Sequence, residues 1–338
     1  MKKWLLMVIA VLTIFVLAAC GSNDSSDAQE PDDSGEKAED TEEETYQVGA
    51  TQILEHPSLD AAYEGFKAAI DEAGLKVEYD FQSAQNDQNN VSTISNKFVA
   101  DGVDLIFANS TPSALGALQA TSEIPILFTS VTDPIGAGLV EAMDKPGENI
   151  TGVTDLHPDA IKETVGFIDK NFEGASVGLI YNAGEQNSVS QIDTVKEAAE
   201  GTSISFVERT VANSAEVQQA AVTIVSEVDV IYIVTDNTVV SALETVVGVA
   251  NEQDIPLIVG EPDSVALGGF ATYGIDYYTI GYRTGEMAVE ILTGEKSPKD
   301  IPAEYPPKIE LFINKQAAEE QGIEWQSEWD EAKLVEQD

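Results

Sequence analysis

The sequence predicts an α/β protein with two similar lobes, each built on a parallel sheet flanked by helices, and joined by several hinge crossings. Two observations predict this fold class. Short apolar strands alternate with helical stretches along most of the chain, and the second half of this pattern repeats the first. Strands that are apolar throughout are typical of parallel sheets whose two faces are both covered by helices.

The elements follow one another regularly in both halves. A Pro146-Gly147 loop separates the halves, and the helix at 59–73 has apolar residues at helical spacing. The expected strands of the first half are 47–52, 77–81, 105–108 and 126–129, with further helices at 88–100 and 112–121. The expected strands of the second half are 177–181, 205–211, 230–234 and 257–259.

An internal repeat supports two lobes rather than one continuous sheet. The matching segments occur in the same order: QVGATQI (47–53) with SVGLIYN (176–182), DLIFANSTPSAL (104–115) with DVIYIVTDNTVVSAL (229–243), and EIPILFTS (123–130) with DIPLIVGE (254–261). Open α/β sheets bind ligands at the carboxyl ends of their strands. We therefore expect the carboxyl ends of the strands in both lobes to face one shared cleft.

The last part of the chain is too short for a third domain and should complete the two lobes. A strand at 270–276, an amphipathic helix at 277–292 and a strand at 308–314 are expected. Repeated passage between the lobes permits closure by bending, with Thr154 and Gly274 near the crossings. The expected domains are lobe I (46–154, completed by about 275–295), lobe II (155–272, completed by about 308–325) and an acidic tail (326–338). Trp325 and Trp329 lie in the charged, frayed end of the chain and are expected to serve local packing.

The N-terminus has the pattern of a secretory signal. Lys2 and Lys3 precede an apolar run that ends in Leu17-Ala18-Ala19-Cys20, and Cys20 is the only cysteine of the chain. This end resembles the lipobox of bacterial lipoproteins, in which the cysteine is lipidated and becomes the mature N-terminus. An ordinary signal peptide with an incidental cysteine, or a short membrane anchor, is the alternative. The resemblance implies an extracytoplasmic protein that is attached to the cell membrane through its lipid alone.

Residues 21–45 are expected to form a disordered acidic tether. They hold eleven Asp and Glu, a single lysine and no aromatic residue, so they cannot bury enough apolar surface to fold. An acidic cation-binding arm is the alternative, but no fixed ligand spacing supports it.

Without the tether and the signal, 49 acidic and 14 basic residues remain, a net charge of about −35. This acidic surface suits high salt or high pH.

Composition excludes several classes of function. The chain has no basic surface that could neutralise phosphates, so nucleic acid is not an expected partner. After Cys20 no cysteine remains for disulfides or thiol catalysis, and His56 and His157 are the only histidines. No phosphate loop or metal cluster is found. We therefore expect no enzyme, no cofactor and no metal, and a protein that is a monomer.

The expected strand ends are polar and could hold a ligand. Ser110 and Thr111 precede a helix that starts near Pro112, and a helix N-terminus with hydroxyls suits a carboxylate. A plain N-cap is the alternative for these residues. In the matching turn of the second half, Asp236 could bind an ammonium group or could also be a helix cap. The two matching turns therefore differ, because the first carries only hydroxyls and amides and the second carries a carboxylate. From this difference we predict that Ser110 and Thr111 hold a ligand carboxylate. We also predict that Asp236, assisted by Glu185 and Asn187, holds the ligand's ammonium.

Several segments make the resemblance to a family specific. The chain is similar, from about residue 47 to 323, to ABC-transporter substrate-binding lipoproteins that include tryptophan-binding and tyrosine-binding members. The resemblance implies a type I periplasmic-binding-protein-like fold and delivery of a small ligand to a membrane permease. It is carried by LFTSVTDPIGAGLV (127–140), NITGVTD (149–155), YNAGEQNS (181–188), TDNTVVSALE (235–244), VGEPDSVALGG (259–269) and ATYGIDYYTIGYRTGEMAVEIL (271–292).

The same resemblance implies a set of ligand-binding residues. They are rich in carboxylates and hydroxyls and contain no Lys or Arg, which suits a ligand with an amine, such as an aromatic amino acid. An extracytoplasmic sensor, or a binding protein for another amine-bearing or sugar-like ligand, is the alternative. The residues are Gln52, Ser110, Thr111, Thr129, Ser130, Asp133, Asn182, Glu185, Asn187, Ser188, Asp236, Asn237, Thr238, Glu261, Tyr273 and Asp276.

Overall fold

The computed structural model describes residues 45–337, which belong to one compact unit. The predicted signal peptide with Cys20 and the tether up to residue 44 lie outside the described residues, and Thr45 begins the first strand. No helix among residues 45–337 combines the length and the hydrophobicity that crossing a bilayer requires.

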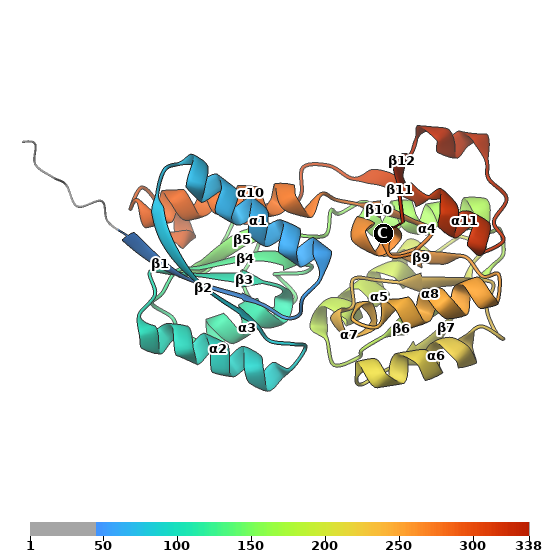
Figure 1. The fold of residues 1–338 in the computed structure, drawn as a ribbon, viewed down its shortest axis with the longest axis horizontal. Coiled ribbons are helices and arrows are strands. Elements are labelled where there is room, and N and C mark those ends of the chain that lie inside the picture. Colours follow the sequence, from blue (N-terminus) through green and yellow to red (C-terminus); the bar gives the residue numbers. More distant parts are fainter. Residues whose placement is uncertain (1–44, 338) are drawn as a thin grey trace, which may run out of the picture. The chain divides into compact units, whose positions relative to one another are not determined.

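Lobe I is built on a five-stranded sheet in which every neighbouring pair is parallel (Figure 1). The strand order is β2-β1-β3-β4-β5. Apolar side chains of two helices cover each face of the sheet. The strands are β1 (Thr45–Gln52), β2 (Lys76–Ser83), β3 (Leu105–Asn109), β4 (Ile126–Val131) and β5 (Ile150–Thr154); α1 (Pro57–Glu72) and α10 (Tyr277–Leu292) cover one face, and α2 (Gln88–Asp101) and α3 (Thr111–Ala120) cover the other.

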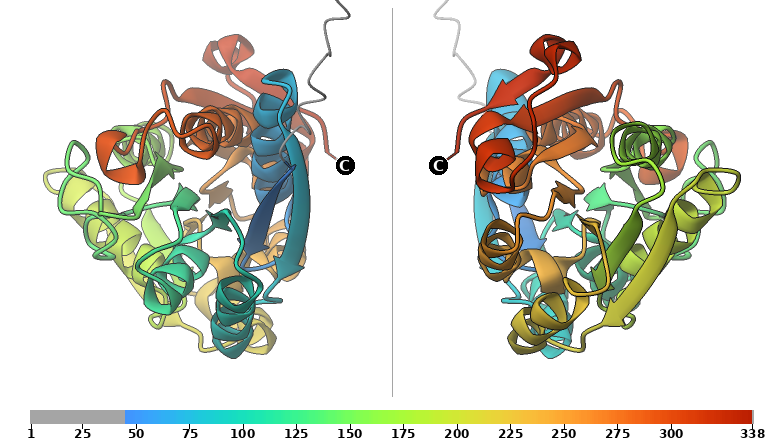
Figure 2. Two further views of the ribbon diagram at one scale, coloured as in Figure 1. Left: turned by 90° about the vertical axis from the view of Figure 1, so that its left-hand side faces the viewer. Right: turned by 90° about the vertical axis from the view of Figure 1, so that its right-hand side faces the viewer.

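Lobe II is built on a seven-stranded sheet in the order β12-β11-β10-β9-β8-β6-β7, with an antiparallel pair at β10 and β11. Helices again flank the sheet (Figure 2). The strands are β6 (Ser176–Tyr181), β7 (Ser205–Thr210), β8 (Val230–Ile233), β9 (Leu257–Val259), β10 (Ala271–Gly274), β11 (Glu310–Asn314) and β12 (Lys333–Val335). The helices are α4 (Ala160–Asn171), α5 (Gln186–Ala198), α6 (Val217–Ile224), α7 (Asn237–Val240), α8 (Leu243–Glu252), α9 (Pro262–Ala266) and α11 (Lys315–Glu320).

Helix α10 comes late in the chain but belongs to lobe I, where it lies against α1. Glycines permit the close approach of the two helices. A Cβ atom on Gly281 would lie 1.8 Å from the Ala62 carbonyl oxygen, and one on Gly65 would lie 2.1 Å from the Tyr278 carbonyl oxygen. Both distances are far below van der Waals contact, so larger residues here would force the helices apart.

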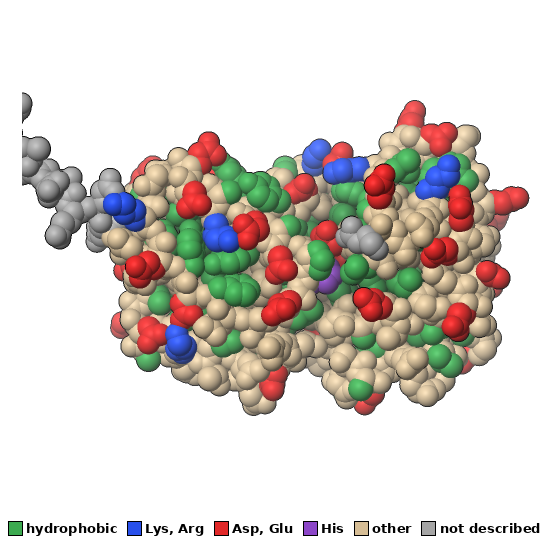
Figure 3. Space-filling model, in the orientation of Figure 1, with side chains coloured by type: hydrophobic (Ala, Val, Ile, Leu, Met, Phe, Trp, Pro, Cys, Tyr) green, Lys and Arg blue, Asp and Glu red, His purple; other side chains and the backbone are tan. Residues whose placement is uncertain are grey.

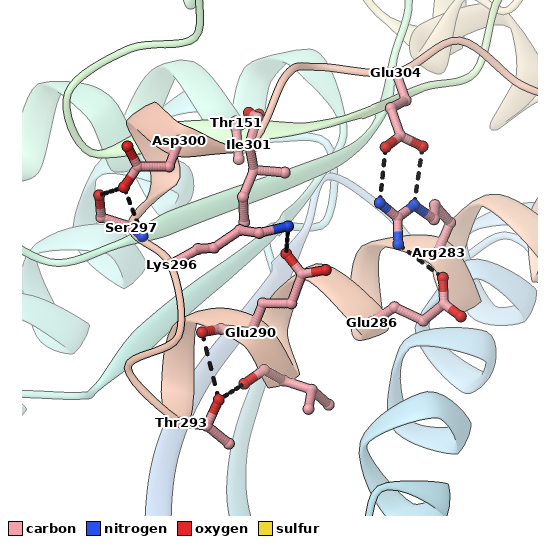
Figure 4. Close-up of polar contacts among 11 residues, drawn as sticks. Thr151, Arg283, Glu286, Glu290, Thr293, Lys296, Ser297, Asp300, Ile301 and Glu304 are labelled. Atoms are coloured by element: carbon pink, nitrogen blue, oxygen red, sulfur yellow. Dashed lines mark hydrogen bonds and ion pairs between the residues drawn. The ribbon is translucent and has the colours of Figure 1, made fainter.

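The chain passes between the lobes at 155–159, 275–276 and 305–309. Glu304 fixes the last of these connections to lobe I. Its backbone N–H donates to the Gly152 carbonyl oxygen and its carbonyl accepts from the Thr154 N–H, at 3.0 and 2.9 Å. Its carboxylate accepts two hydrogen bonds from Arg283 of α10, at 2.9 and 2.8 Å (Figure 4). This crossing is therefore held to β5 and α10 at a defined point.

The fold class predicted from the sequence is confirmed: two lobes with largely parallel sheets, flanked by helices and joined by several crossings. The end of the chain is ordered rather than frayed, whereas the expected packing of Trp329 is present. Residues 327–331 form a 3₁₀ helix, and Trp329 is only 2% exposed, with its ring centroid 5.2 Å from that of Phe270. Trp329 packs on the core of lobe II, and the charged residues around it gave no sign of this packing in the sequence.

Candidate functional site

A cavity with an empty volume of about 440 Å³, which includes its opening to solvent, lies between the two lobes. Among the described residues that line it there is no Lys or Arg. Lobe I and the crossings contribute Leu54, His56, Ser58, Leu59, Thr111, Ser130, Thr132, Asp155 and Tyr277; lobe II contributes Asn187, Thr235, Asp236, Asn237, Val240 and Glu261.

The starts of α1 and α9 meet at this cavity. His56 caps α1 and Glu261 caps α9, and each is followed by a proline, the residue best suited to the first helical position. The Ser58 hydroxyl contacts the carboxylates of both Glu261 (2.7 Å) and Asp263. Burial, and then the neighbouring Glu261, raise the pKa of Asp263. The contacts of Ser58 join lobe I to lobe II beside the cavity.

The start of α7 is organised by two buried carboxylates. Asp236 caps α7 by accepting from the Val239 N–H (2.8 Å), and it also accepts from the Asn182 N–H (2.6 Å). Glu185 accepts from the N–H and the side chain of both Asn237 and Thr238, at 2.6–3.2 Å. Burial, and then the nearby Glu185, raise the pKa of Asp236 to about 6, although hydrogen bonds act in the opposite direction.

Asp155 lies at the first crossing, directly after β5. Its backbone N–H donates to the Val131 carbonyl oxygen at 3.2 Å, and its Oδ2 accepts from the Tyr277 hydroxyl at 3.2 Å. Burial raises the pKa of Asp155 to about 6, while the hydroxyls of Thr132 and Tyr277 act in the opposite direction. Burial also raises the pKa of Tyr277 far above its ordinary value, so this side chain is a neutral donor.

Four side chains that line the cavity carry a buried polar atom without a hydrogen-bond partner among residues 45–337. These atoms are Oδ1 of Asp155, Oδ1 of Asn187, Oγ1 of Thr111 and Nε2 of His56. Asn187 and Thr111 are 3% and 2% exposed. A buried polar group without a partner costs about 1–3 kcal/mol, so this concentration in one cavity indicates a place for a polar ligand.

A second polar network lies behind the cavity, at the carboxyl ends of β1, β3 and β4. Asn109 donates to the Gln52 side chain (3.2 Å) and accepts from the Ser130 hydroxyl (2.6 Å). Gln52 in turn donates to Asp60 at 2.8 Å. Ser130 is the member of this network that reaches the cavity, and its φ of 53° turns the chain at the end of β4. The network fixes the Ser130 side chain, which forms part of the cavity wall.

The structure brings some of the sequence-predicted site residues to the cavity and places others elsewhere. Those that line it are Thr111, Ser130, Asn187, Asp236, Asn237 and Glu261. Those that do not are Gln52, Ser110, Thr129, Asp133, Asn182, Glu185, Ser188, Thr238, Tyr273 and Asp276.

The residues outside the cavity have identifiable positions. Ser110 caps α3 and Asp276 caps α10. Asp133 accepts from Ser190 of lobe II at 2.9 Å. Tyr273 lies against Phe167 of α4, with ring centroids 6.5 Å apart. Asn182, Glu185 and Thr238 line a neighbouring open groove with an empty volume of about 1,320 Å³, and Thr129 and Ser188 are fully buried.

Sequence reasoning missed several residues that line the cavity. Asp155 was missed because the short strand before it, with Gly152 at its centre, has no long apolar run. His56 and Ser58 were missed although a proline lies between them, a signal for a helix start. Leu54, Leu59 and Val240, which form the apolar part of the lining, carry no signal that distinguishes them from core residues.

Comparisons with known proteins agree with this arrangement. The family described as ABC transporter substrate binding protein matches residues 47–332. A tyrosine-binding protein from Clostridioides difficile is 42% identical over 319 residues, which cover 93% of this chain and 90% of the relative.

Solved structures extend the comparison. A conserved domain protein from Vibrio cholerae (36% identity, TM-score 0.83) and an ABC domain from Streptococcus pneumoniae in complex with L-Trp (34%, 0.82) cover 87% and 86% of this chain and 100% of their own. The ligand-free, open structure of a substrate binding protein with adhesive properties from Clostridium difficile (38%, 0.65) also covers 87% of this chain and 100% of its own. The chain belongs to the ABC transporter substrate binding protein family.

Proposed function

We propose that this protein is the extracytoplasmic substrate-binding lipoprotein of an ABC importer and captures an aromatic amino acid, such as tryptophan or tyrosine, between its lobes. The cavity is the observation that carries the proposal. Its lining combines carboxylates and hydroxyls with apolar side chains, and none of the described residues that line it is a Lys or Arg. Such a site suits a ligand that brings its own positive charge.

The parts of the lining match the parts of an amino acid. The carboxylates suit the ammonium, and the buried Thr111 hydroxyl at the start of α3 suits the carboxylate, which a helix N-terminus also favours. Leu54, Leu59 and Val240 suit an apolar side chain. Tyr277 also lines the cavity and offers an aromatic ring to a ligand, whereas Phe128, Tyr181 and Tyr273 do not line it.

The names of two relatives support an aromatic ligand. One relative is a tyrosine-binding protein, and one solved structure holds L-Trp. The chain resembles the L-Trp complex more than the open, ligand-free structure by TM-score (0.82 against 0.65), although the open structure has the higher sequence identity. Hydrogen bonds between the lobes, such as Asn86 to Thr238 at 3.3 Å, also support a closed arrangement.

The proposal includes the lipid anchor, a membrane permease as partner and a monomeric state. It also holds that the site binds rather than catalyses, because family membership supports a solute-binding role.

The anchor is tested by Cys20→Ala, which should release the protein from membranes in cell fractionation without changing its fold. A variant that stays fully membrane-bound would contradict the anchor and leave the ligand proposal intact.

The ligand is tested by titrating the purified protein with each of the twenty amino acids in a calorimeter. We expect saturable binding of tryptophan or tyrosine and weak or undetectable binding of small and acidic amino acids. Saturable binding of a sugar, with no amino acid bound, would overturn the proposal.

A further inference from the structure

Three carboxylates among the described residues line the cavity, and in two of them both oxygens already accept hydrogen bonds from the protein. Glu261 accepts from the Asp263 N–H (2.6 Å), the Ser264 N–H (2.7 Å) and the Ser58 hydroxyl. Asp236 accepts from the N–H groups of Asn182 and Val239. Both side chains hold the start of a short helix, and a ligand would have to share them with the backbone.

Asp155 differs from these two carboxylates. Its Oδ2 accepts from the Tyr277 hydroxyl, and the Thr132 hydroxyl also lies beside the carboxylate. Its Oδ1 is buried and accepts no hydrogen bond of normal geometry from the described residues. Asp155 also lies at the first crossing between the lobes, where it can contact a ligand enclosed by both. A carboxylate oxygen in this position is a hydrogen-bond acceptor that the protein itself does not use.

Asn187 provides a second acceptor on the opposite lobe. Its Nδ2 donates to the Thr235 carbonyl oxygen at 3.1 Å, and this bond sets the orientation of the amide. The remaining Oδ1 is therefore the free end of the amide, and it is buried at the cavity without a partner among the described residues. An amide oxygen can only accept, so it must meet a donor.

We propose that Asp155 is the specificity-determining residue that holds the ammonium of the bound amino acid, with Asn187 as a second acceptor, and that Asp236 is a helix cap. This assignment rests on the proposed function and replaces the sequence-based expectation of Asp236 for that role. An ammonium has three N–H donors and no acceptor. Unused acceptors from both lobes would therefore recognise it and favour closure around the ligand.

The test compares ligands with and without the ammonium. L-Tyrosine and 3-(4-hydroxyphenyl)propionate, or L-tryptophan and indole-3-propionate, differ in the amine alone. We expect Asp155→Asn to weaken binding of the amino acid by 100-fold or more and to leave binding of the amine-free analogue within about threefold. The ratio of the two affinities should therefore fall by at least thirtyfold. Asp155→Ala serves as a second variant.

Two further variants separate recognition from structural support. Asp236→Asn weakens a helix cap, so it should lower both affinities by a similar factor and leave their ratio unchanged. Tyr277→Phe removes the hydrogen bond to Asp155 but keeps its carboxylate, so the ratio should also stay close to that of the wild type. Thermal unfolding of each variant checks that it is folded.

The outcomes distinguish this assignment from the function that underlies it. A ratio that stays unchanged in Asp155→Asn and Asp155→Ala, or that collapses in Asp236→Asn, would overturn the assignment alone. Wild-type protein that binds neither tyrosine nor tryptophan would overturn the proposed aromatic ligand, and the assignment with it.

Discussion

At the scale of single residues, four of the described side chains that line the cavity carry a polar atom that the fold leaves unpaired. Asp155 shows the energetic consequence. Its pKa is raised from 3.8 to about 6 because burial disfavours the charged form, and one pKa unit corresponds to about 1.4 kcal/mol. The ionised carboxylate therefore destabilises the ligand-free protein, and a bound ammonium would remove this cost.

The first prediction follows from this shift. Since the pKa is higher in the folded than in the unfolded state, the cost is fully present above pH 6 and disappears as the pH falls towards 4. Asp155→Asn should therefore raise the free energy of unfolding of the ligand-free protein by about 1–3 kcal/mol at pH 7.5, allowing for the partial exposure of the residue. The gain should shrink at pH 5. Urea unfolding at both values measures it, and a variant less stable than the wild type at pH 7.5 would contradict it.

How far the sequence predicts the site can be seen residue by residue. Thr111, Asn187 and Asp236 follow strands that are recognisable by their apolar runs, so their place at the cavity could be predicted. Asp155 follows a five-residue strand with a glycine at its centre, and a short run of this kind has no clear periodicity. The unused hydrogen-bonding capacity that distinguishes Asp155 from Asp236 depends on neighbours distant in sequence. It is visible only in the structure.

At the scale of elements, the contact between α1 and α10 holds lobe I together although the two helices are far apart in the chain. Gly281 lies at this contact, whereas at Gly248, within α8, a Cβ atom would meet no described atom within 4 Å apart from the neighbouring backbone of its own helix. Both are glycines in the interior of a helix, so they form a matched pair. Helix propensity favours alanine over glycine by about 1 kcal/mol at both positions.

The second prediction uses this pair. Gly281→Ala should lower the free energy of unfolding by about 3 kcal/mol, the upper part of the usual range for overpacking, because its Cβ would lie 1.8 Å from the Ala62 carbonyl oxygen. Gly248→Ala should instead raise it by about 0.5–1 kcal/mol. Urea unfolding at pH 7.5 compares both variants with the wild type. Equal effects at the two positions would show that the helices do not pack this closely.

At the scale of the whole molecule, the order of lobes and crossings was predictable because the halves repeat the same strand and turn segments. The order of the C-terminal tail was not predictable, since Trp329 lies among charged residues and its packing depends on Phe270 and Phe167 from other parts of the chain.

The acidic excess is distributed over both lobes, as Figure 3 shows for one face. Repulsion among these charges opposes the compact state.

The third prediction concerns this repulsion. Salt screens charges on the surface over about 10 Å at 0.1 M and about 3 Å at 1 M, so NaCl should raise the thermal unfolding midpoint between these concentrations. KCl should act equally if screening is the cause. A midpoint that is independent of NaCl would contradict a destabilising role for the net charge of about −35 in the globular part.

The last prediction concerns motion of the lobes. Because the cavity is lined from both lobes, ligand binding should shift open molecules to the closed arrangement and reduce the radius of gyration. The rotation should take place near Thr154 and Gly274, where the chain leaves β5 and β10. Small-angle scattering with and without saturating L-tyrosine or L-tryptophan measures the change. Asp155→Asn is the matched control, because its weaker binding should leave it largely without ligand, and therefore open, at the same ligand concentration. Unchanged scattering of wild-type protein whose saturation is verified by calorimetry would place the ligand within a single lobe, where binding needs no closure.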